Sequence, residues 1–328
     1  MSARGFALLL TALCTAAGCR LALGPVADGG ELRLTLAIPA SEVLELRTTA
    51  VCSAVFLGAA LGLAGLALQV LLRNPLASPF VLGISSGAGF GVALVLAGAY
   101  AAGVSAVSFG GEIAGAMLGA FATLLLVGWL GRSRAGHDPT TLVLSGVIVG
   151  AIFSAGTMLV EQMVPHGLRG DLLSWMAGRL PELPGRTAFW TLLASVVAGW
   201  LVLASNARAL DVACFTDDEA LASGVDIVRL RRILFGVGGF LAAVAVAYAG
   251  PIGFVGLIGP HIARRLVGPR HTVLVAGSAL AGAALLVTAD TARQAIDLGT
   301  GRLPVGVVTA LAGGPAFLWL LRSGRWNR

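Results

Sequence analysis

Long apolar stretches, separated by short polar connections, run through nearly the whole chain. A helix needs about 20 residues to cross the hydrocarbon core of a bilayer. Ten stretches reach or approach that length, at about residues 5–24, 49–71, 80–102, 109–131, 140–160, 187–205, 230–249, 253–268, 272–290 and 304–322. The pattern predicts an all-α integral membrane protein. Its ten transmembrane helices are expected to form one domain, residues 1–328, with both termini on the same side.

Two polar segments interrupt this pattern. Residues 25–48 are expected to form an external loop with an amphipathic piece near residues 40–46. Residues 206–229 form the longest polar connection on the opposite side. The middle of this connection predicts a short helix from Asp217, because Thr216 is a suitable N-cap and Glu219 follows at the third position. Gly224 is expected to end that helix.

Glycine recurs at every third position between residues 250 and 259, and prolines stand near both ends of this stretch. In a soluble helix each interior glycine costs about 1 kcal/mol and each interior proline about 3 kcal/mol. In a membrane bundle, small residues permit close helix packing, and broken helices are tolerated where neighbouring protein satisfies the backbone. The stretch is therefore either a tightly packed structural helix or a short, kinked span beside a transport pathway.

A weak internal similarity links two glycine-interrupted segments. Residues 79–87 follow an inward span and residues 253–259 follow an outward one, and both contain a Phe-Val pair followed closely by glycine and isoleucine. Broken segments at matching places in oppositely oriented halves are typical of an inverted repeat with a transport site between the halves. Chance similarity between two glycine-rich stretches is the competing explanation.

Composition and charge agree with a membrane protein. Hydrophobic residues make up 57% of the chain and charged residues 12%, against roughly 25% charged residues in soluble domains. A β-barrel would show alternating segments of about ten residues instead. Fourteen of the 22 arginines fall on one set of ends and loops: Arg4, Arg73, Arg132, Arg134, Arg208, Arg229, Arg231, Arg232, Arg264, Arg265, Arg270, Arg322, Arg325 and Arg328. The positive-inside rule assigns that set, with both termini, to the cytoplasmic side of the cell inner membrane.

The same composition argues against several function classes. The chain has no lysine, and a P-loop requires one, so any coupled ATP hydrolysis belongs to another subunit. No predicted span carries a charge near its centre, which disfavours an ion-coupled secondary transporter. The sequence has neither a His-Glu-x-x-His motif nor the paired groups of a membrane-embedded enzyme. Its four histidines have no metal-ligand spacing, so no metal site and no cofactor is expected in this chain.

The N-terminal run to Cys19 has some features of a signal peptide. We interpret it as an uncleaved first span, because Ala16 stands where a lipoprotein cleavage site prefers leucine and a multispan body follows.

Four ordered segments resemble the membrane permeases of the iron-siderophore, haem and cobalamin ABC importers, the FecCD type. They are residues 72–79 with 82–88, residues 218–225, residues 249–264, and residues 289–293 with 303–310. Together they extend the similarity over about residues 40–322. No single segment is decisive, and the ordered set is specific.

The resemblance implies a function and a set of partners. The expected function is to pass a ferric-siderophore-type chelate from a periplasmic or lipid-anchored binding protein across the inner membrane by alternating access. Haem or cobalamin is the alternative substrate. Two permease subunits, expected to be a homodimer with a heterodimer left open, surround the pathway. Two cytoplasmic ATPase subunits bind ATP and Mg²⁺, and the permease itself is not an enzyme.

The resemblance also assigns the polar connection 206–229 to ATPase contact. By position, the expected contact residues are Asp217, Asp218, Glu219, Ala220, Ala222, Gly224 and Val225. Small residues beside a glycine turn permit close docking, and carboxylates pair with arginine or lysine. Phe215-Thr216-Asp217 replaces the family's Leu-Gly-Glu and Ser223 replaces a leucine, which predicts a matched ATPase that is not interchangeable.

Arginines on the outer face are expected to receive carboxylates of the binding protein. Arg47 and Arg293 match two such positions in the family, and Arg302 stands as a local substitute where an acidic residue is common. The family's second arginine after Arg47 is replaced by Ala50. In the competing explanation, Arg47 and Arg293 anchor helix ends at the interface, or Arg293 pairs locally with Asp290 or Asp297.

Pathway and gating residues are expected among the hydroxyl and small residues of the broken segments. The candidates are Ser85, Ser86, Gly87, Gly250, Pro251, Gly253, Gly256 and, at the outer mouth, Met158. Such a lining suits a path that does not hold its ligand tightly. For Met158, packing is the alternative role.

Overall fold

The computed structural model describes residues 2–28, 31–36, 41–104, 109–133, 136–181, 185–215, 217–296 and 303–322. Its α-helices are α1 (Ser2–Ala22), α2 (Ser41–Leu71), α3 (Ile84–Ala101), α4 (Phe109–Leu130), α5 (Pro139–Met163), α6 (His166–Met176), α7 (Arg186–Ser205), α8 (Ala207–Ala213), α9 (Asp217–Ala222), α10 (Ile227–Ala249), α11 (Val255–Val267), α12 (His271–Ala295) and α13 (Val305–Arg322). A 3-10 turn, η1 (Pro79–Leu82), precedes α3. Two small hairpins pair β1 (Leu23–Asp28) with β2 (Glu31–Leu36) and β3 (Arg132–Ser133) with β4 (Gly136–His137).

Each of the ten predicted spans corresponds to a helix. Within the part of the chain that the structure describes, eight helices are long and apolar enough to cross a membrane: α1, α2, α3, α4, α5, α7, α10 and α12. The other two are α11, which has 13 residues and contains Pro260, and α13, which contains Pro315. The all-α membrane fold is therefore confirmed, together with the short eighth span.

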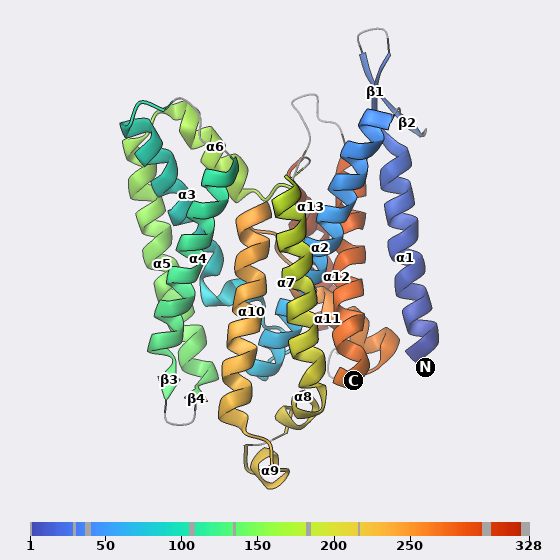
Figure 1. Cartoon of the computed structure of the whole chain (residues 1–328), viewed down its shortest axis with the longest axis vertical. Helices are drawn as coiled ribbons and strands as arrows, with labels where there is room; N and C mark the ends of the chain where they lie inside the picture. Colours follow the sequence, from blue (N-terminus) through green and yellow to red (C-terminus); the bar gives the residue numbers. More distant parts are fainter. Residues whose placement is uncertain are drawn as a thin grey trace.

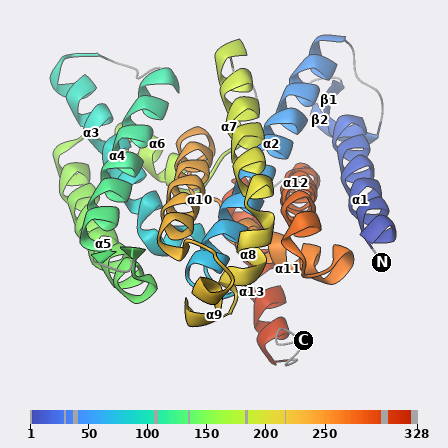
Figure 2. The same cartoon turned by 60° about the horizontal axis from the view of Figure 1, so that its bottom comes forward.

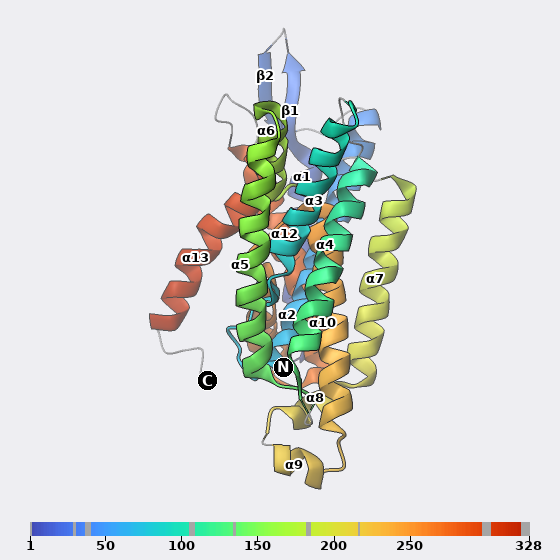
Figure 3. The same cartoon turned by 90° about the vertical axis from the view of Figure 1, so that its left-hand side faces the viewer.

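The helices run along the long axis of the molecule, with α9 at one end and the β1–β2 hairpin at the other (Figure 1). The first turn of α1 and the last turn of α13 both lie toward the α9 end. The prediction that the two ends of the chain share one side is thus correct. Figure 3 shows α13 diverging from α11 and α12 as it approaches that end.

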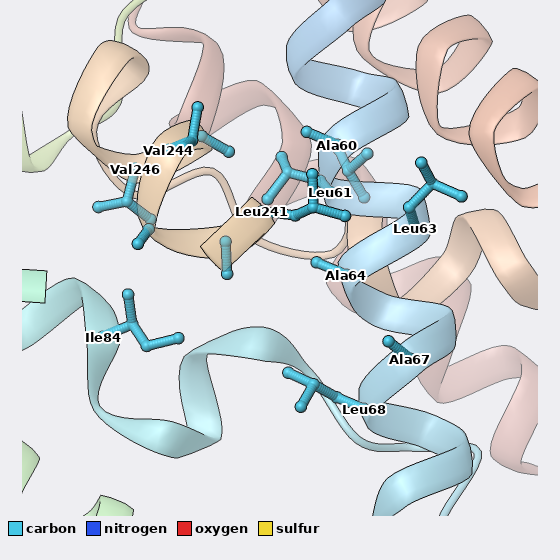
Figure 4. Packing of buried hydrophobic residues seen from close by; sticks show 14 of the residues in the cluster. Ala60, Leu61, Leu63, Ala64, Ala67, Leu68, Ile84, Leu241, Val244 and Val246 are labelled. Carbon is cyan, nitrogen blue, oxygen red and sulfur yellow. The ribbon is translucent and has the colours of Figure 1, made fainter. Parts of the chain in front are cut away.

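The core of the bundle is formed around α2, α10 and α12, with the other helices around them (Figure 2). In the most apolar stretch of α2, 83% of the residues are buried, and in that of α10 the share is 72%. Ala60, Ala64 and Ala67 of α2 stand among leucines, and Leu241 of α10 lies close to Leu61 and Ala64 (Figure 4). Because lipid is as apolar as these side chains, close packing rather than burial from water holds such helices together.

Glycines form the closest helix crossings. In α3 and α4, Gly87 and Gly91 face Gly115 and Gly119, and a Cβ added to Gly119 would lie 1.9 Å from the carbonyl oxygen of Gly87. Both pairs follow the small-xxx-small spacing that lets helix backbones touch.

A second set of glycines brings α2 against α12 and α11. A Cβ on Gly62 would lie 2.2 Å from the Ser278 carbonyl oxygen, and a Cβ on Gly65 would lie 1.6 Å from the Gly256 carbonyl oxygen. Side chains are therefore excluded from these contacts, in which backbone meets backbone.

Several sequence-based expectations need correction. Residues 41–48 are the first turns of α2 rather than part of an external loop, and much of the preceding segment forms the β1–β2 hairpin. Span 80–102 begins only at Ile84, after η1. Residues 227–229 already belong to α10, so the polar connection ends near Asp226. Helix α6 was not predicted, because at 11 residues it is too short and too polar to resemble a span.

Candidate functional site

The predicted short helix in the polar connection exists as α9, preceded by α8. Gly224 ends it as predicted: its φ is 75°, in the left-handed region where glycine carries no Cβ penalty. The Gly224 N–H donates to the Leu221 carbonyl at 2.9 Å, and the Val225 N–H donates to the Ala220 carbonyl at 3.1 Å. These two bonds form a Schellman cap. The suggested N-cap, Thr216, lies outside the described residues.

The predicted ATPase-contact residues divide into two groups. Glu219, Ala222 and Gly224 are exposed and Val225 is half-buried, whereas Ala220 is fully buried and faces the bundle. The side chain of Asp218 lies outside the described part of the structure. Sequence reasoning missed two exposed apolar residues here, Phe215 and Leu221, each 60% exposed. The signal available for them was an apolar side chain within an otherwise polar segment.

Asp217, the first residue of α9, is engaged within the chain. Its Oδ1 accepts hydrogen bonds from Arg73 Nη2 at 2.6 Å and from Arg231 Nη2 at 3.0 Å, and its Oδ2 lies 3.0 Å from the same Arg231 nitrogen. Partial burial raises the pKa of Asp217, but the two guanidinium groups together outweigh that effect and hold the pKa below its usual value. The carboxylate therefore stays charged at neutral pH, and this contribution to stability is lost only as the pH falls through the lowered pKa.

A second carboxylate ties α8 to the core. Asp211 Oδ1 accepts the backbone N–H of His271 at 2.9 Å and lies 2.7 Å from Nδ1 of the same residue. His271 is the first residue of α12 and is 3% exposed. The connection between α7 and α10 is thus fastened to α2, α10 and α12.

At the opposite end of the molecule, buried charges join α1, α2 and α12. Asp290 is fully buried and pairs with Arg293 and with Arg20, whose Nε lies 2.6 Å from Asp290 Oδ2. Arg47 is 5% exposed, and its Nη1 donates to the Leu21 carbonyl at 2.7 Å. The local pairing of Arg293 with Asp290, one of the alternatives from the sequence, is confirmed.

This geometry bears on the expected docking of a binding protein. Arg47 and Arg293 lie inside the chain, at 5% and 6% exposure, and Arg302 lies outside the described residues. The docking role stays a prediction for all three. In this structure Arg47 joins α2 to the end of α1, and Arg293 pairs within α12 with the carboxylate that Arg20 of α1 also binds.

The glycine-rich break between α10 and α11 is tightly packed at its start. Gly250 has φ 68°, and a Cβ there would lie 2.2 Å from the Trp175 carbonyl oxygen. A Cβ added to Gly178 would lie 2.5 Å from the Pro251 carbonyl oxygen, and one added to Gly306 would lie 2.8 Å from it. The end of α6, the break and the start of α13 therefore meet through glycine. Gly253, by contrast, faces open space.

The two similar broken segments share a local geometry and touch. Gly83 precedes α3 with φ 72°, and Phe254 precedes α11 with φ 66°, so each helix starts after a left-handed residue. A Cβ on Gly256 would lie 3.1 Å from Pro79 Cδ. Contact between matching breaks agrees with an inverted repeat. A left-handed phenylalanine is also strained, and such strain concentrates at functional sites.

The remaining predicted pathway residues are scattered. Ser85 and Ser86 are half-buried in the first turn of α3, and Ser154 Oγ of α5 lies 3.1 Å from Ser86 Oγ. Gly87 is buried against α4, and Met158 of α5 is 67% exposed. The pathway role stays a prediction for these four residues and for Gly250 and Pro251. In the described ranges, no three His, Cys, Asp or Glu side chains come close enough to hold a metal ion.

Comparison with known proteins agrees with this architecture. A model of the FecCD transport family matches residues 21–323. The cobalamin import system permease protein BtuC of Halobacterium salinarum is 39% identical over 273 residues, covering 81% of this chain and 69% of that protein. The hemin transport system permease protein HmuU of Yersinia pestis is 35% identical over 292 residues, covering 87% and 84%. A solved structure of a metal-chelate-type ABC transporter in an inward-facing conformation superimposes with a TM-score of 0.84 at 27% identity, covering 98% and 99%. This chain belongs to the FecCD transport family and is an ABC-importer permease.

Proposed function

We propose that this permease moves a large metal chelate across the cell inner membrane, driven by separate ATPase subunits that dock at the α8–α9 end. The observation that carries the proposal is an exposed surface formed by α9 and the turn before it. There Phe215 and Leu221, which we call the docking tip, lie outside the bundle beside a Schellman turn. Apolar side chains at a membrane-distal tip contact neither lipid nor the core, and such exposure marks protein interfaces. ATP and Mg²⁺ bind on the docked subunits, and this chain holds no cofactor.

The arginine distribution supports the orientation. Arg73, Arg231 and Arg232 lie at the α9 end with the first turn of α1, and positively charged residues remain on the cytoplasmic side. The ATPase then meets α9 from the cytoplasm, and a periplasmic or lipid-anchored binding protein delivers ligand at the hairpin end.

Leu221→Asp is expected to weaken ATPase binding. A central apolar anchor contributes about 2 kcal/mol or more to an interface, which corresponds to about thirtyfold in affinity. The measurement is titration of the purified permease in nanodiscs with its ATPase. Arg270→Gln, an exposed change at the same end, serves as the control. Equal ATPase affinities for the wild type and Leu221→Asp would contradict docking of the ATPase at α9.

Gly224→Val is expected to reduce transport without blocking membrane insertion. A β-branched residue in the left-handed region costs about 1–2 kcal/mol, and the helix cap that sets the tip is lost with it. Gly224→Asn is the matched control, because asparagine tolerates this conformation. Uptake and membrane abundance of both variants are compared in cells. Equal uptake by the valine and asparagine variants would contradict a role for the turn.

The names of the relatives support a proposal for the substrate class. Their names give cobalamin and haem, and the sequence resemblance adds ferric siderophores, so the shared chemistry is a metal held in a large organic chelate. We propose the ferric siderophore with haem and cobalamin as equal candidates. Uptake of the three labelled chelates by cells lacking this gene, with and without a plasmid copy, distinguishes them. Restored uptake of free zinc or manganese instead would overturn the chelate proposal.

A second copy of this chain is the proposed permease partner. Large apolar side chains are exposed along α5 and α13, among them Leu144, Ile152, Leu311 and Leu318. A cavity of about 500 Å³ between α13 and helices α1, α11 and α12 is lined almost wholly by apolar residues. The mass of the detergent-solubilised complex tests the homodimer against a heterodimer with a related permease.

A further inference from the structure

Asp217 joins three separate parts of the fold. It begins α9, Arg73 directly follows the end of α2, and Arg231 lies in the first turns of α10. Arg73 holds the region a second time, because its Nε donates to the carbonyl of Ala213 at the end of α8 at 3.0 Å. Both short helices of the polar connection are therefore fixed to the end of α2 by one arginine side chain.

The partners of Asp217 belong to the most deeply packed helices. Arg231 is only 7% exposed, and α2 and α10 have the two highest buried shares among the spanning helices. From α2, the glycine contact at Gly65 leads directly to Gly256 in α11. Ion pairs and backbone contacts therefore connect α9 to the end of α2, to α10 and, through α2, to α11.

The side chain of Asp217 is 41% exposed, but its carboxylate is already bound within the chain. Leu221 and Phe215 are exposed, whereas both carboxylate oxygens of Asp217 meet arginines of the same chain. Charge-assisted hydrogen bonds of this kind fix geometry more strongly than neutral ones. The expected role of Asp217 as an ATPase contact does not use this inward engagement.

We propose that Asp217 is a positioning residue that clamps α9 to α2 and α10 through Arg73 and Arg231, so that ATPase movement is transmitted to the spanning helices. This inference rests on the proposed docking of the ATPase at α9. It assigns to one carboxylate a mechanical role that is separable from binding: the tip holds the ATPase, and the clamp passes on the movement.

The test uses the complete importer, with its ATPase and binding protein, reconstituted in liposomes. ATPase affinity, ATP hydrolysis and ligand transported per ATP are measured for Asp217→Asn, which keeps the side-chain size and removes the charge. We expect unchanged ATPase affinity and a transport-to-hydrolysis ratio lowered about tenfold, within the usual range of coupling between sites. Asp217→Glu, which keeps the charge, is expected to recover part of the ratio.

A double-mutant cycle separates the clamp from a general loss of structure. Asp217→Asn removes the pairs with both Arg73 and Arg231, whereas Arg231→Gln removes only one of them. Arg231→Gln is therefore expected to lower the ratio by a smaller factor, and the double variant is expected to lower it no further than Asp217→Asn alone. Arg232→Gln, the exposed neighbour on α10, is expected to leave it unchanged.

Two results would overturn the clamp: an unchanged ratio in Asp217→Asn, or a loss of ATPase affinity in that variant, which would make Asp217 a docking contact. Failure of the proposed ATPase docking at α9 gives a different result: the Leu221→Asp variant then binds the ATPase with the same affinity as the wild type.

Discussion

Asp290→Asn is expected to destabilise the protein by about 3–5 kcal/mol, the usual cost of removing one partner from a buried ion pair. The carboxylate is fully buried, and it is shared by Arg20 and Arg293, whose side chains are 4% and 7% exposed. Asparagine keeps the size but leaves two guanidinium groups with no opposing charge from this residue. The measurement is SDS-induced unfolding of the purified protein in mixed micelles.

The control for this change is Glu42→Gln, an exposed carboxylate at the start of α2, expected to change stability by less than about 0.5 kcal/mol. A second variant, Arg20→Met with Asp290→Asn, is expected to recover part of the loss, since removing both members of a buried pair is often nearly neutral. If Asp290→Asn unfolds like the wild type, the cluster does not stabilise the fold.

Gly65→Ala is expected to prevent accumulation of folded protein. The added methyl group would lie 1.6 Å from the Gly256 carbonyl oxygen. The nearest atoms all belong to the Gly256 backbone, so no side chain can move aside to make room. The cost therefore exceeds the roughly 1–3 kcal/mol of ordinary overpacking. The measurement is the yield of monodisperse protein after detergent extraction and size-exclusion chromatography.

Gly236→Ala in α10 provides the matched control, because nothing lies within 4 Å of a Cβ added to Gly236. Alanine is the better helix former there, by up to about 1 kcal/mol, so its yield should equal or exceed that of the wild type. Similar yields from both alanine variants would show that α2 and α11 are not in backbone contact.

The spans could be predicted from sequence because each is a local apolar run of sufficient length. The break after Ala249 and the end of α9 were also predictable, since glycine and proline determine backbone conformation locally. Helix α6 was missed because it is too short and too polar to resemble a span. The β1–β2 hairpin was missed although residues 31–36 alternate polar and apolar side chains, because only long apolar runs were interpreted as elements there. The pairing of Asp217 with Arg73 could not be predicted from the local hydrophobic pattern or from motif spacing, because the two residues lie 144 positions apart in the sequence.

In the candidate site too, features set by neighbouring residues could be predicted, whereas contacts between distant parts of the chain could not. The family resemblance placed the carboxylates of the polar connection toward the ATPase by their position in the sequence. Burial of Ala220 and the ion pairs of Asp217 depend on where α9 lies against α2 and α10, and that is set by tertiary packing. Phe215 and Leu221 were available as apolar exceptions in a polar segment, and a search for such exceptions would have found them.

The crossings made by Gly87, Gly91, Gly115 and Gly119 restrict how this molecule can change shape. At these crossings the nearest atoms are mostly backbone, with Thr123 and Val95 the only side chains among the three atoms nearest each glycine position, so little can rearrange there. We expect α3 with α4, and α2 with α12, to tilt as stiff blocks during a transport cycle. Most of the change in shape is then expected in α5 and α13, because their outward faces are not covered by other helices of this chain.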